Sequence, residues 1–454
     1  MKHRLKNKFW ILPMTVILLL SVVFILPVSA ESSGTSDSLI FSVSGKTNVV
    51  DPQTATMRNS GSVIDYGPLH IPKIVIASSD AMKASGTRAA NTEIYDLVTF
   101  NSLIPVRSDT VTMPITLYGQ TYTINLKKSN YDDLGADGRD SYQGTISGMS
   151  DSVVLFTVTD QNLLYGTVRF GNQSIVIYPV QNREYTARTV MPLHVVYSEK
   201  DLLQPSEPVP FCGNTDNMTS PPLITANSEL SATRGGEYDW AYVDLLIVTD
   251  KNFYDLEADW IACAKDYLSE ANYQFQRPDI KVVLRGSYLV SVQSMIEMSN
   301  DPRSVTDPYQ LVMDKFPKEY LIMAQKDVCV YLGGKDASPT SPGYEYAQGM
   351  GANRHTWSQM VEDNSPGMYD GNRHSRVYNF IHEIGHTLHA YHELAYEWWD
   401  LVPPFRHITV MCGMYIGDSI QWDFSSSVPE YNGDATHDNA FVIRVYKHEV
   451  AALA

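Results

Sequence analysis

The stretch His382-Glu383-Ile384-Gly385-His386-Thr387-Leu388-His389-Ala390-Tyr391-His392 places three imidazoles and a carboxylate at the spacing of a catalytic zinc site. His382 and His386 are four residues apart, so on a helix they lie on one face and both can reach one metal ion. Glu383 then lies beside the metal as the candidate general base. With His392 as third ligand, one tetrahedral position stays open for water, which is typical of a catalytic zinc. The sequence therefore predicts a zinc hydrolase.

The residues around the motif predict an amphipathic helix. An apolar stripe at helical spacing would dock this helix on a core, and it comprises Val377, Phe380, Ile381, Ile384 and Leu388. His382, Glu383 and His386 project to the side of the stripe, which suits a helix that forms the floor of a cleft. The alternative is an ordinary helix whose surface histidines bind nothing. A third His six residues after a chance H-E-x-x-H is rare, which favours the metal site.

The first thirty residues have the pattern of an export signal. Basic residues precede an apolar run from position 9 to 28, and Val28-Ser29-Ala30 fits a small-residue cleavage site. We therefore expect residues 1–30 to be a signal peptide and the mature protein to be secreted. The alternative is a protein anchored at the cell envelope by this segment, because an uncleaved run of about twenty apolar residues can span a bilayer.

Length and charge set further bounds. A chain of 454 residues exceeds what one hydrophobic core usually serves, so we expect two folded domains. The net charge of −17 argues against a nucleic-acid partner and against an anionic membrane. Four cysteines are too few for a disulfide scaffold in a chain of this length.

The first half, residues 31–203, is predicted to be rich in β-strands. Residues 115–117 and 122–126 alternate around Gly119-Gln120, which predicts an antiparallel hairpin. Further strands are expected at 142–147, 152–159, 163–170 and 174–178. No titratable cluster of catalytic type occurs in this half, so we interpret it as a folding or inhibitory domain.

Residues 204–235 are rich in Pro, Ser, Thr, Asn and Gly and predict a linker, with Arg234 as a candidate processing site. Strand and helix alternate beyond it. Strands are expected at 243–248, 280–284 and 327–332, helices at 253–275 and within 291–315, and an edge strand near 350–361. This order predicts a mostly parallel α/β sheet.

On these residues the chain resembles a metzincin zinc metalloprotease, most closely the reprolysin (adamalysin)-like branch with a propeptide. The family pattern is H-E-x-x-H-x-x-G-x-x-H followed by a methionine turn. Met411, nineteen residues after His392, resembles the methionine of that turn, which supports the metal ligands from below. Residues 433–440 resemble the end of bacterial and archaeal reprolysin-like domains, and residues 142–180 loosely resemble a reprolysin propeptide.

One position departs from the family pattern. His389 stands where the family has the glycine at which the chain turns sharply toward the metal. Glycine tolerates a positive φ without steric cost, whereas His is strained there but is among the side chains enriched in that conformation. The departure leaves open an alternative ligand set in which His389 replaces His392.

Cys212 lies in a segment that resembles the cysteine switch of metzincin propeptides. The segment is Pro210-Phe211-Cys212-Gly213-Asn214-Thr215-Asp216, and the resemblance implies that its thiolate occupies the open zinc position. The alternative is a disulfide between Cys212 and one of Cys263, Cys329 and Cys412. Cys263 and Cys329 fall on a predicted helix and strand and are interpreted as core thiols or a mutual bridge.

These observations predict an α/β protein in which a β-rich prodomain precedes a metzincin-like catalytic domain, residues 236–454, with a mostly parallel twisted sheet and a zinc-binding helix. The predicted function is a secreted zinc endopeptidase made as a zymogen, with one catalytic Zn²⁺ and Glu383 as general base; a calcium requirement is left open. Its expected partners are a protein or peptide substrate and its own prodomain as inhibitor, with no nucleic acid and no membrane unless the N-terminal segment is retained.

The alternative function is a secreted binding or adhesion protein whose degenerate metalloprotease domain binds zinc but is inactive. His389 in place of glycine favours this alternative, and the intact Glu383 opposes it.

Overall fold

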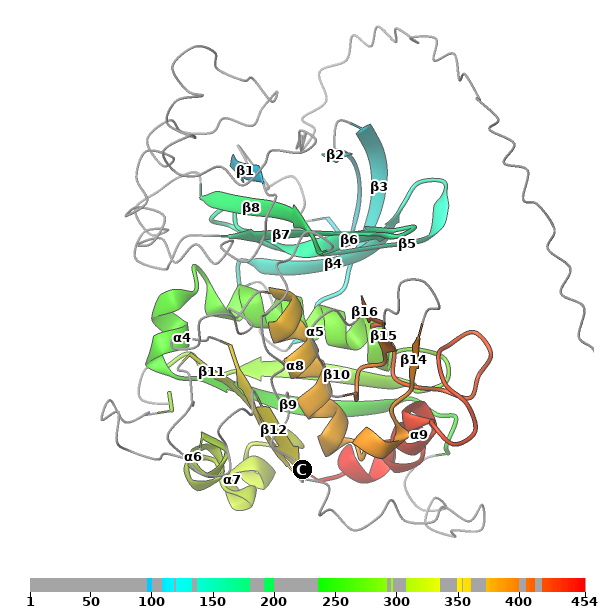
Figure 1. The fold of residues 1–454 in the computed structure, drawn as a ribbon. Helices are drawn as coiled ribbons and strands as arrows, with labels where there is room; N and C mark the ends of the chain where they lie inside the picture. The colour runs from blue at the N-terminus through cyan, green and yellow to red at the C-terminus, as the bar shows by residue number, and fades with distance from the viewer. Residues whose placement is uncertain are drawn as a thin grey trace, which may run out of the picture. The chain divides into compact units, whose positions relative to one another are not determined.

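The larger sheet of this protein, seen in a computed structural model, is antiparallel throughout. Its strands are β1 (Asp96–Thr99), β2 (Thr110–Leu117), β3 (Gln120–Lys128), β4 (Arg139–Ile146), β5 (Met149–Thr159), β6 (Leu164–Phe170), β7 (Gln173–Pro179) and β8 (Leu193–Ser198). They are arranged in the order β1-β8-β7-β6-β5-β4-β3-β2, so each strand from β2 to β7 pairs with the next in sequence, and β1 pairs with β8 (Figure 1). The expected hairpin is confirmed, because Leu117 of β2 pairs with Gln120 of β3.

The structure describes residues 96–99, 108–117, 120–132, 137–179, 192–199, 236–291, 295–296, 308–334, 349–352, 354–360, 373–399, 406–412 and 419–453. The expected signal peptide, the linker at 204–235 and Cys212 lie outside these residues. Within them, no helix is both long and apolar enough to cross a bilayer.

A second sheet has five strands, of which four are parallel. They are β9 (Ala241–Thr249), β10 (Val282–Tyr288), β11 (Val328–Gly333), β12 (Gly349–Ala352) and β13 (His355–Gln359). The order is β10-β9-β11-β13-β12, and β12 runs antiparallel to β13 at one edge. A small third sheet contains β14 (Glu397–Trp399), β15 (Arg406–Ile408) and β16 (Ser419–Ile420).

The helices fall close to the positions that periodicity predicts. They are α4 (Lys251–Leu256), α5 (Trp260–Phe275), α6 (Pro308–Lys315), α7 (Lys318–Met323), α8 (Arg373–Thr387) and α9 (Asn439–Val450), with a short 3₁₀ turn η6 at His392–Leu394. The single helix expected at 253–275 is divided in two. Asp259 is the reason, because its side chain caps the start of α5 by accepting hydrogen bonds from the backbone N–H groups of Ile261 and Ala262.

The predicted fold class was wrong. We expected an α/β protein with a mostly parallel, metzincin-like sheet, whereas the largest sheet has eight antiparallel strands and the parallel strands form the smaller sheet. Periodicity identifies strands but does not show that the strands of the β-rich half join into one sheet larger than the parallel one. Consecutive hairpins instead join its strands into the dominant sheet of the described chain.

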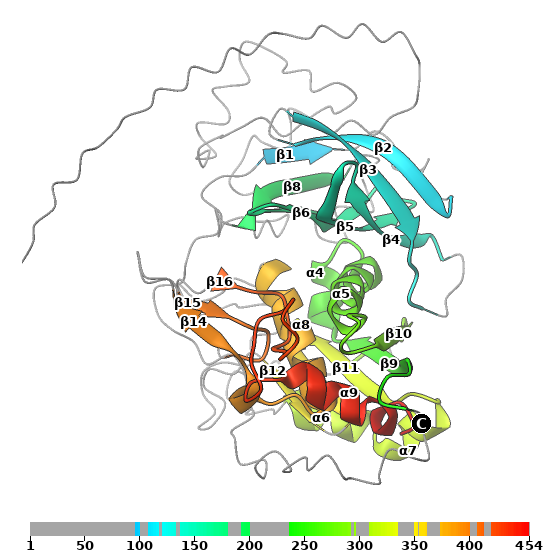
Figure 2. The same cartoon turned by 90° about the vertical axis from the view of Figure 1, so that its right-hand side faces the viewer.

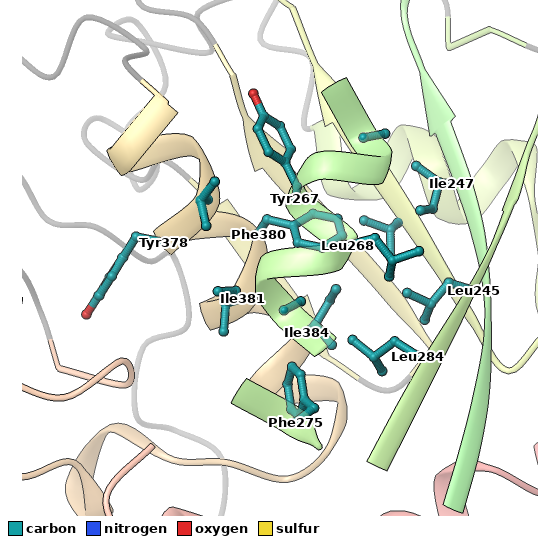
Figure 3. Close-up of a cluster of buried hydrophobic side chains, with 14 of the residues drawn as sticks. Leu245, Ile247, Tyr267, Leu268, Phe275, Leu284, Tyr378, Phe380, Ile381 and Ile384 are labelled. Carbon is teal, nitrogen blue, oxygen red and sulfur yellow. The ribbon is translucent and has the colours of Figure 1, made fainter. Parts of the chain in front are cut away.

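Two layers of helices cover the five-stranded sheet. Leu245 and Ile247 of β9 point to the face that carries α5 and α8, and the alternate residues Leu246 and Val248 point to the face that carries α6. Figure 2 shows α5 and α8 side by side. Figure 3 shows the core between α5, α8 and the sheet, with Ile384 of α8 at its centre. The predicted apolar stripe around Ile384 is confirmed, because all five of its side chains are buried.

Helix α5 is covered on both sides. Fifteen of its sixteen residues are buried, including the charged Lys265, Asp266 and Glu270. One side packs on β10 and α8, and the other packs on β4, β5 and β6 of the antiparallel sheet. A helix that is buried all round must have polar partners on both sides for its charged residues. Those partners link the antiparallel sheet to the helix that carries the histidines.

A buried network of ion pairs supplies this link. Arg373, the first residue of α8, donates hydrogen bonds to both oxygens of Asp266 at 2.6 and 2.8 Å and to Glu270 at 2.8 Å. Glu270 also accepts hydrogen bonds from Arg169 at 2.6 Å and from Thr167 at 2.7 Å, both on β6. The network therefore joins α8, α5 and the antiparallel sheet through side chains that are buried, except for Arg169, which is 15% exposed.

The buried network predicts a large loss of stability on removal of its central guanidinium. Arg373→Met leaves Asp266 and part of the Glu270 charge buried without a partner, and we expect the free energy of unfolding to fall by about 3–5 kcal/mol. Lys251→Met is the matched control, because its pair with Asp255 is more than half exposed on both sides and contributes at most about 1 kcal/mol. Urea denaturation of both variants measures the difference. Equal losses would contradict the role given to the network.

Candidate metal centre

Helix α8 ends in a turn that reverses the chain after His386. His389 has a φ of +66°, the left-handed conformation expected at the position of the family glycine. Its N–H donates to the carbonyl of His386 at 3.1 Å, and the N–H of Ala390 donates to the carbonyl of Gly385 at 2.9 Å. These two hydrogen bonds form a Schellman motif, which ends a helix with one left-handed residue. The chain then runs extended through Tyr391 into η6.

This turn brings the third histidine of the motif to the first two. The Nε2 atoms of His382 and His386 are 3.2 Å apart, those of His382 and His392 are 3.1 Å apart, and those of His386 and His392 are 3.0 Å apart. Among the residues that the structure describes, this is the one group of three or more His, Cys, Asp or Glu side chains that could hold a metal ion. The structure therefore assembles the set with His392.

Backbone carbonyls fix the orientation of two of the rings. The Nδ1 atom of His382 lies 2.8 Å from the carbonyl oxygen of Val410, and that of His386 lies 2.9 Å from the carbonyl oxygen of Ala390. A carbonyl oxygen can only accept, so each Nδ1 carries the proton. In a neutral imidazole the Nε2 atom then has a lone pair and no proton. The two Nε2 atoms consequently cannot share a hydrogen bond with each other.

The electrostatics keep both rings neutral. Burial, reinforced by the neighbouring His392, lowers the pKa of His382 to about 3. Burial and the two other rings lower the pKa of His386 well below its ordinary value. Neutral imidazole is the form that ligates a metal.

The arrangement fits a zinc ion. Tetrahedral zinc with nitrogen ligands at about 2.0–2.1 Å requires the nitrogens to lie roughly 3.3–3.4 Å apart. The three separations, 3.0 to 3.2 Å, are close to that value. Converging lone pairs repel each other unless a cation lies between them, so the donor set suits a metal better than it suits an empty cluster.

Met411 lies under the part of α8 that carries the ligands. It is fully buried, and its Sδ atom lies 2.8 Å from the point where a side-chain carbon on Gly385 would be. The hydroxyl of Tyr378 donates to the carbonyl of Cys412 at 2.8 Å and holds the segment in place. Gly385 therefore allows Met411 to approach α8 closely, and the supporting role that the resemblance implies for Met411 stays a prediction.

Glu383 is fully buried in α8, directly after the first histidine. His389 is separate from the metal group: its ring packs on Tyr446 of α9 with the centroids 4.6 Å apart, and burial lowers its pKa.

Cys263, Cys329 and Cys412 are buried free thiols, so no disulfide joins any two of them. The proposed roles of Cys212 concern a residue that the structure does not describe.

Sequence reasoning missed the groups that orient the rings. Two of them, the carbonyls of Val410 and Ala390, are backbone atoms, and no side-chain pattern reveals them. A third is the side chain of Asn439, which contacts the turn at Tyr391. Its only signal in the sequence is its place at the start of the C-terminal helix.

Comparisons with known proteins add little to this geometry. No protein-family model matches the chain, and no curated protein matches it in sequence. Among solved structures, the chain is similar to the crystal structure of metalloproteinase-II from Bacteroides fragilis, with a TM-score of 0.36, 12% sequence identity, and coverage of 64% of this chain and 84% of that chain. A similarity at this level carries no argument about fold or function, and it does not support the narrower resemblance to reprolysins or to their propeptide.

The turn predicts opposite effects for two neighbouring histidines. His392→Ala removes a nitrogen from the converging set and should weaken zinc binding severely, whereas His389→Gly should leave zinc affinity unchanged. His389→Gly should lower the free energy of unfolding by about 0.5–1.5 kcal/mol, because relief of the left-handed strain is offset by the greater freedom of glycine in the unfolded chain while the ring contact with Tyr446 is lost. Zinc titration and urea denaturation test the pair. The reverse ranking in zinc affinity would make His389 the ligand.

The buried rings also predict a pH dependence for the metal-free protein. His382 has a pKa of about 3 when folded and about 6.5 when unfolded, so the unfolded chain binds more protons between these values. The stabilisation is complete above pH 6.5 and should be lost progressively as the pH falls from there toward 3. His382→Asn, which retains a donor for the Val410 carbonyl, should flatten this slope. Urea denaturation at several pH values in the presence of a chelator measures it, and equal slopes would contradict the assignment.

Proposed function

We propose that this protein is a zinc-dependent endopeptidase in which His382, His386 and His392 hold one zinc ion and Glu383 is the general base. The observation that carries the proposal is the convergence of the three Nε2 atoms within 3.2 Å of one another, with Nδ1 of two rings committed to backbone carbonyls. The sequence H-E-x-x-H on α8 supports peptide hydrolysis over other zinc chemistry, because this motif is typical of metalloproteases.

The ion and the protein side chains have separate roles in the proposed reaction. Zinc, when bound, supplies Lewis acidity, which activates water near neutral pH and polarises a carbonyl. His382, His386 and His392 would hold the ion and would leave it accessible to water or substrate. Glu383 accepts the proton of the attacking water and delivers it to the leaving amine. Glu383 lies fully buried in α8, directly after the first ligand.

Secretion of the protein and its synthesis as an inactive zymogen, both predicted from the sequence, are part of the proposed function. We propose that residues 1–30 direct secretion, that the chain is made as a zymogen, and that the β-rich half acts as its intramolecular inhibitor until the linker at 204–235 is processed. Cys212 is the candidate inhibitory ligand. The substrates are proteins or peptides.

Glu383→Gln is the direct test of the proposed function. The amide keeps the size of the side chain but cannot accept the proton, so we expect zinc content and unfolding behaviour to be retained and cleavage of an unstructured protein to fall by about 10²–10⁴-fold. The exposed Glu397→Gln is the matched control and should cleave at the parental rate. Cleavage by Glu383→Gln at the parental rate would contradict the role of Glu383. A wild-type protein, processed in the linker, that binds zinc but cleaves nothing would instead favour the inactive binding protein.

A further inference from the structure

We infer that Asn439 is a positioning residue of the metal centre, which holds the turn between His386 and His392 in the shape that joins the three imidazoles. The inference rests on the function proposed above. Asn439 is the first residue of α9 and is fully buried, and it contacts the turn from 48 positions further along the chain.

The side-chain amide of Asn439 binds both backbone groups of Tyr391. Its Oδ1 atom accepts a hydrogen bond from the Tyr391 N–H at 2.8 Å, and its Nδ2 atom donates to the Tyr391 carbonyl at 3.0 Å. These bonds fix the two peptide groups on either side of the Tyr391 α-carbon. Tyr391 is thereby held extended, with φ −126° and ψ 150°, and His392 follows directly.

One of these peptide groups also orients the second ligand. The N–H of Tyr391 and the carbonyl of Ala390 belong to the same planar peptide unit. That carbonyl accepts the hydrogen bond from Nδ1 of His386 at 2.9 Å. Asn439 therefore acts on His386 through the peptide that fixes its ring, and on His392 through the backbone that carries it. Partners of this kind, which do not touch the metal, orient the ligands that do.

Ser425 fixes the far side of the third ligand. Its hydroxyl donates to the carbonyl of Leu394 at 2.5 Å and accepts a hydrogen bond from the backbone N–H of Asn439 at 3.1 Å. The segment from Tyr391 to Leu394 is thus held at both ends by groups that also hold each other. His392 lies between these two points.

An amide is required at position 439 because the site needs a donor and an acceptor at fixed spacing. Asparagine supplies both from one planar group. Aspartate has nearly the same shape, but when ionised it only accepts, so one of its oxygens would face the Tyr391 carbonyl without a proton between them. Alanine removes both bonds. The two substitutions therefore test the hydrogen-bonding pattern separately from the volume of the side chain.

Zinc affinity of the full chain, measured by competition with a chelator, tests the inference. We expect Asn439→Ala and Asn439→Asp to bind zinc about 10–100-fold more weakly than the wild type, the range typical for partners that orient metal ligands. The visible absorption spectrum of the Co²⁺-substituted protein should also change, because it reports the geometry around the metal. Asp438→Ala is the matched control. It removes the side chain that caps α9 through the N–H of Phe441 at 2.7 Å but leaves the amide of Asn439 in place. Its zinc affinity and Co²⁺ spectrum should match those of the wild type.

A second measurement separates this inference from the proposed function. Hydrogen exchange of the Tyr391 amide in the metal-free protein should become faster in Asn439→Ala and stay slow in Asp438→Ala. Wild-type zinc affinity in both Asn439 variants would overturn the positioning role and leave the proposed function intact. Failure of the wild type to bind zinc would overturn the proposed function. The exchange rates would then still decide the inference, since unchanged protection in Asn439→Ala shows that the amide does not hold the turn.

Discussion

Three imidazole nitrogens within 3.2 Å of each other form the constraint on which the rest of the structure depends. The Nδ1–H groups of His382 and His386 donate hydrogen bonds to backbone carbonyls, so the lone pairs of their Nε2 atoms point to the space between the three rings. Such an arrangement is costly without a cation, and the surrounding structure must hold it in place. His382 and His386 lie four residues apart, so helix α8 places both rings on one face. The left-handed conformation of His389 then reverses the chain, and this reversal brings His392 to the other two rings.

Helix α5 connects this centre to the antiparallel sheet. It is buried on both sides, and its acidic residues accept from Arg373 at the start of α8 and from Arg169 on β6. Buried pairs of this kind contribute little net stability when complete, but they are costly to break, because each charge would remain without a partner. These ion pairs therefore couple the β-rich half to α8. They lie at the start of the helix, whereas the histidines of the metal centre lie at its end.

The site was more predictable from the sequence than the fold. Spacing alone places His382 and His386 on one face of a helix, and the apolar stripe around Ile384 places that helix on a core. Spacing and the family resemblance named His392 as the third ligand, but the turn that brings it to the other two histidines depends on backbone hydrogen bonds that no side-chain pattern reveals. Strand positions followed from alternation, but apart from the hairpin of β2 and β3 the strand partners did not, because pairing between strands that no short turn connects leaves no pattern in a single sequence. The prediction of a mostly parallel sheet failed for that reason.

X-ray absorption at the zinc edge tests the central claim most directly. Applied to the full chain loaded with one equivalent of zinc, it reports the number and type of the ligands and their distances from the metal. The account predicts three imidazole nitrogens at about 2.0–2.1 Å, whichever group occupies the fourth position. Zinc bound by fewer than three imidazoles, or a chain that retains no stoichiometric zinc, would contradict it.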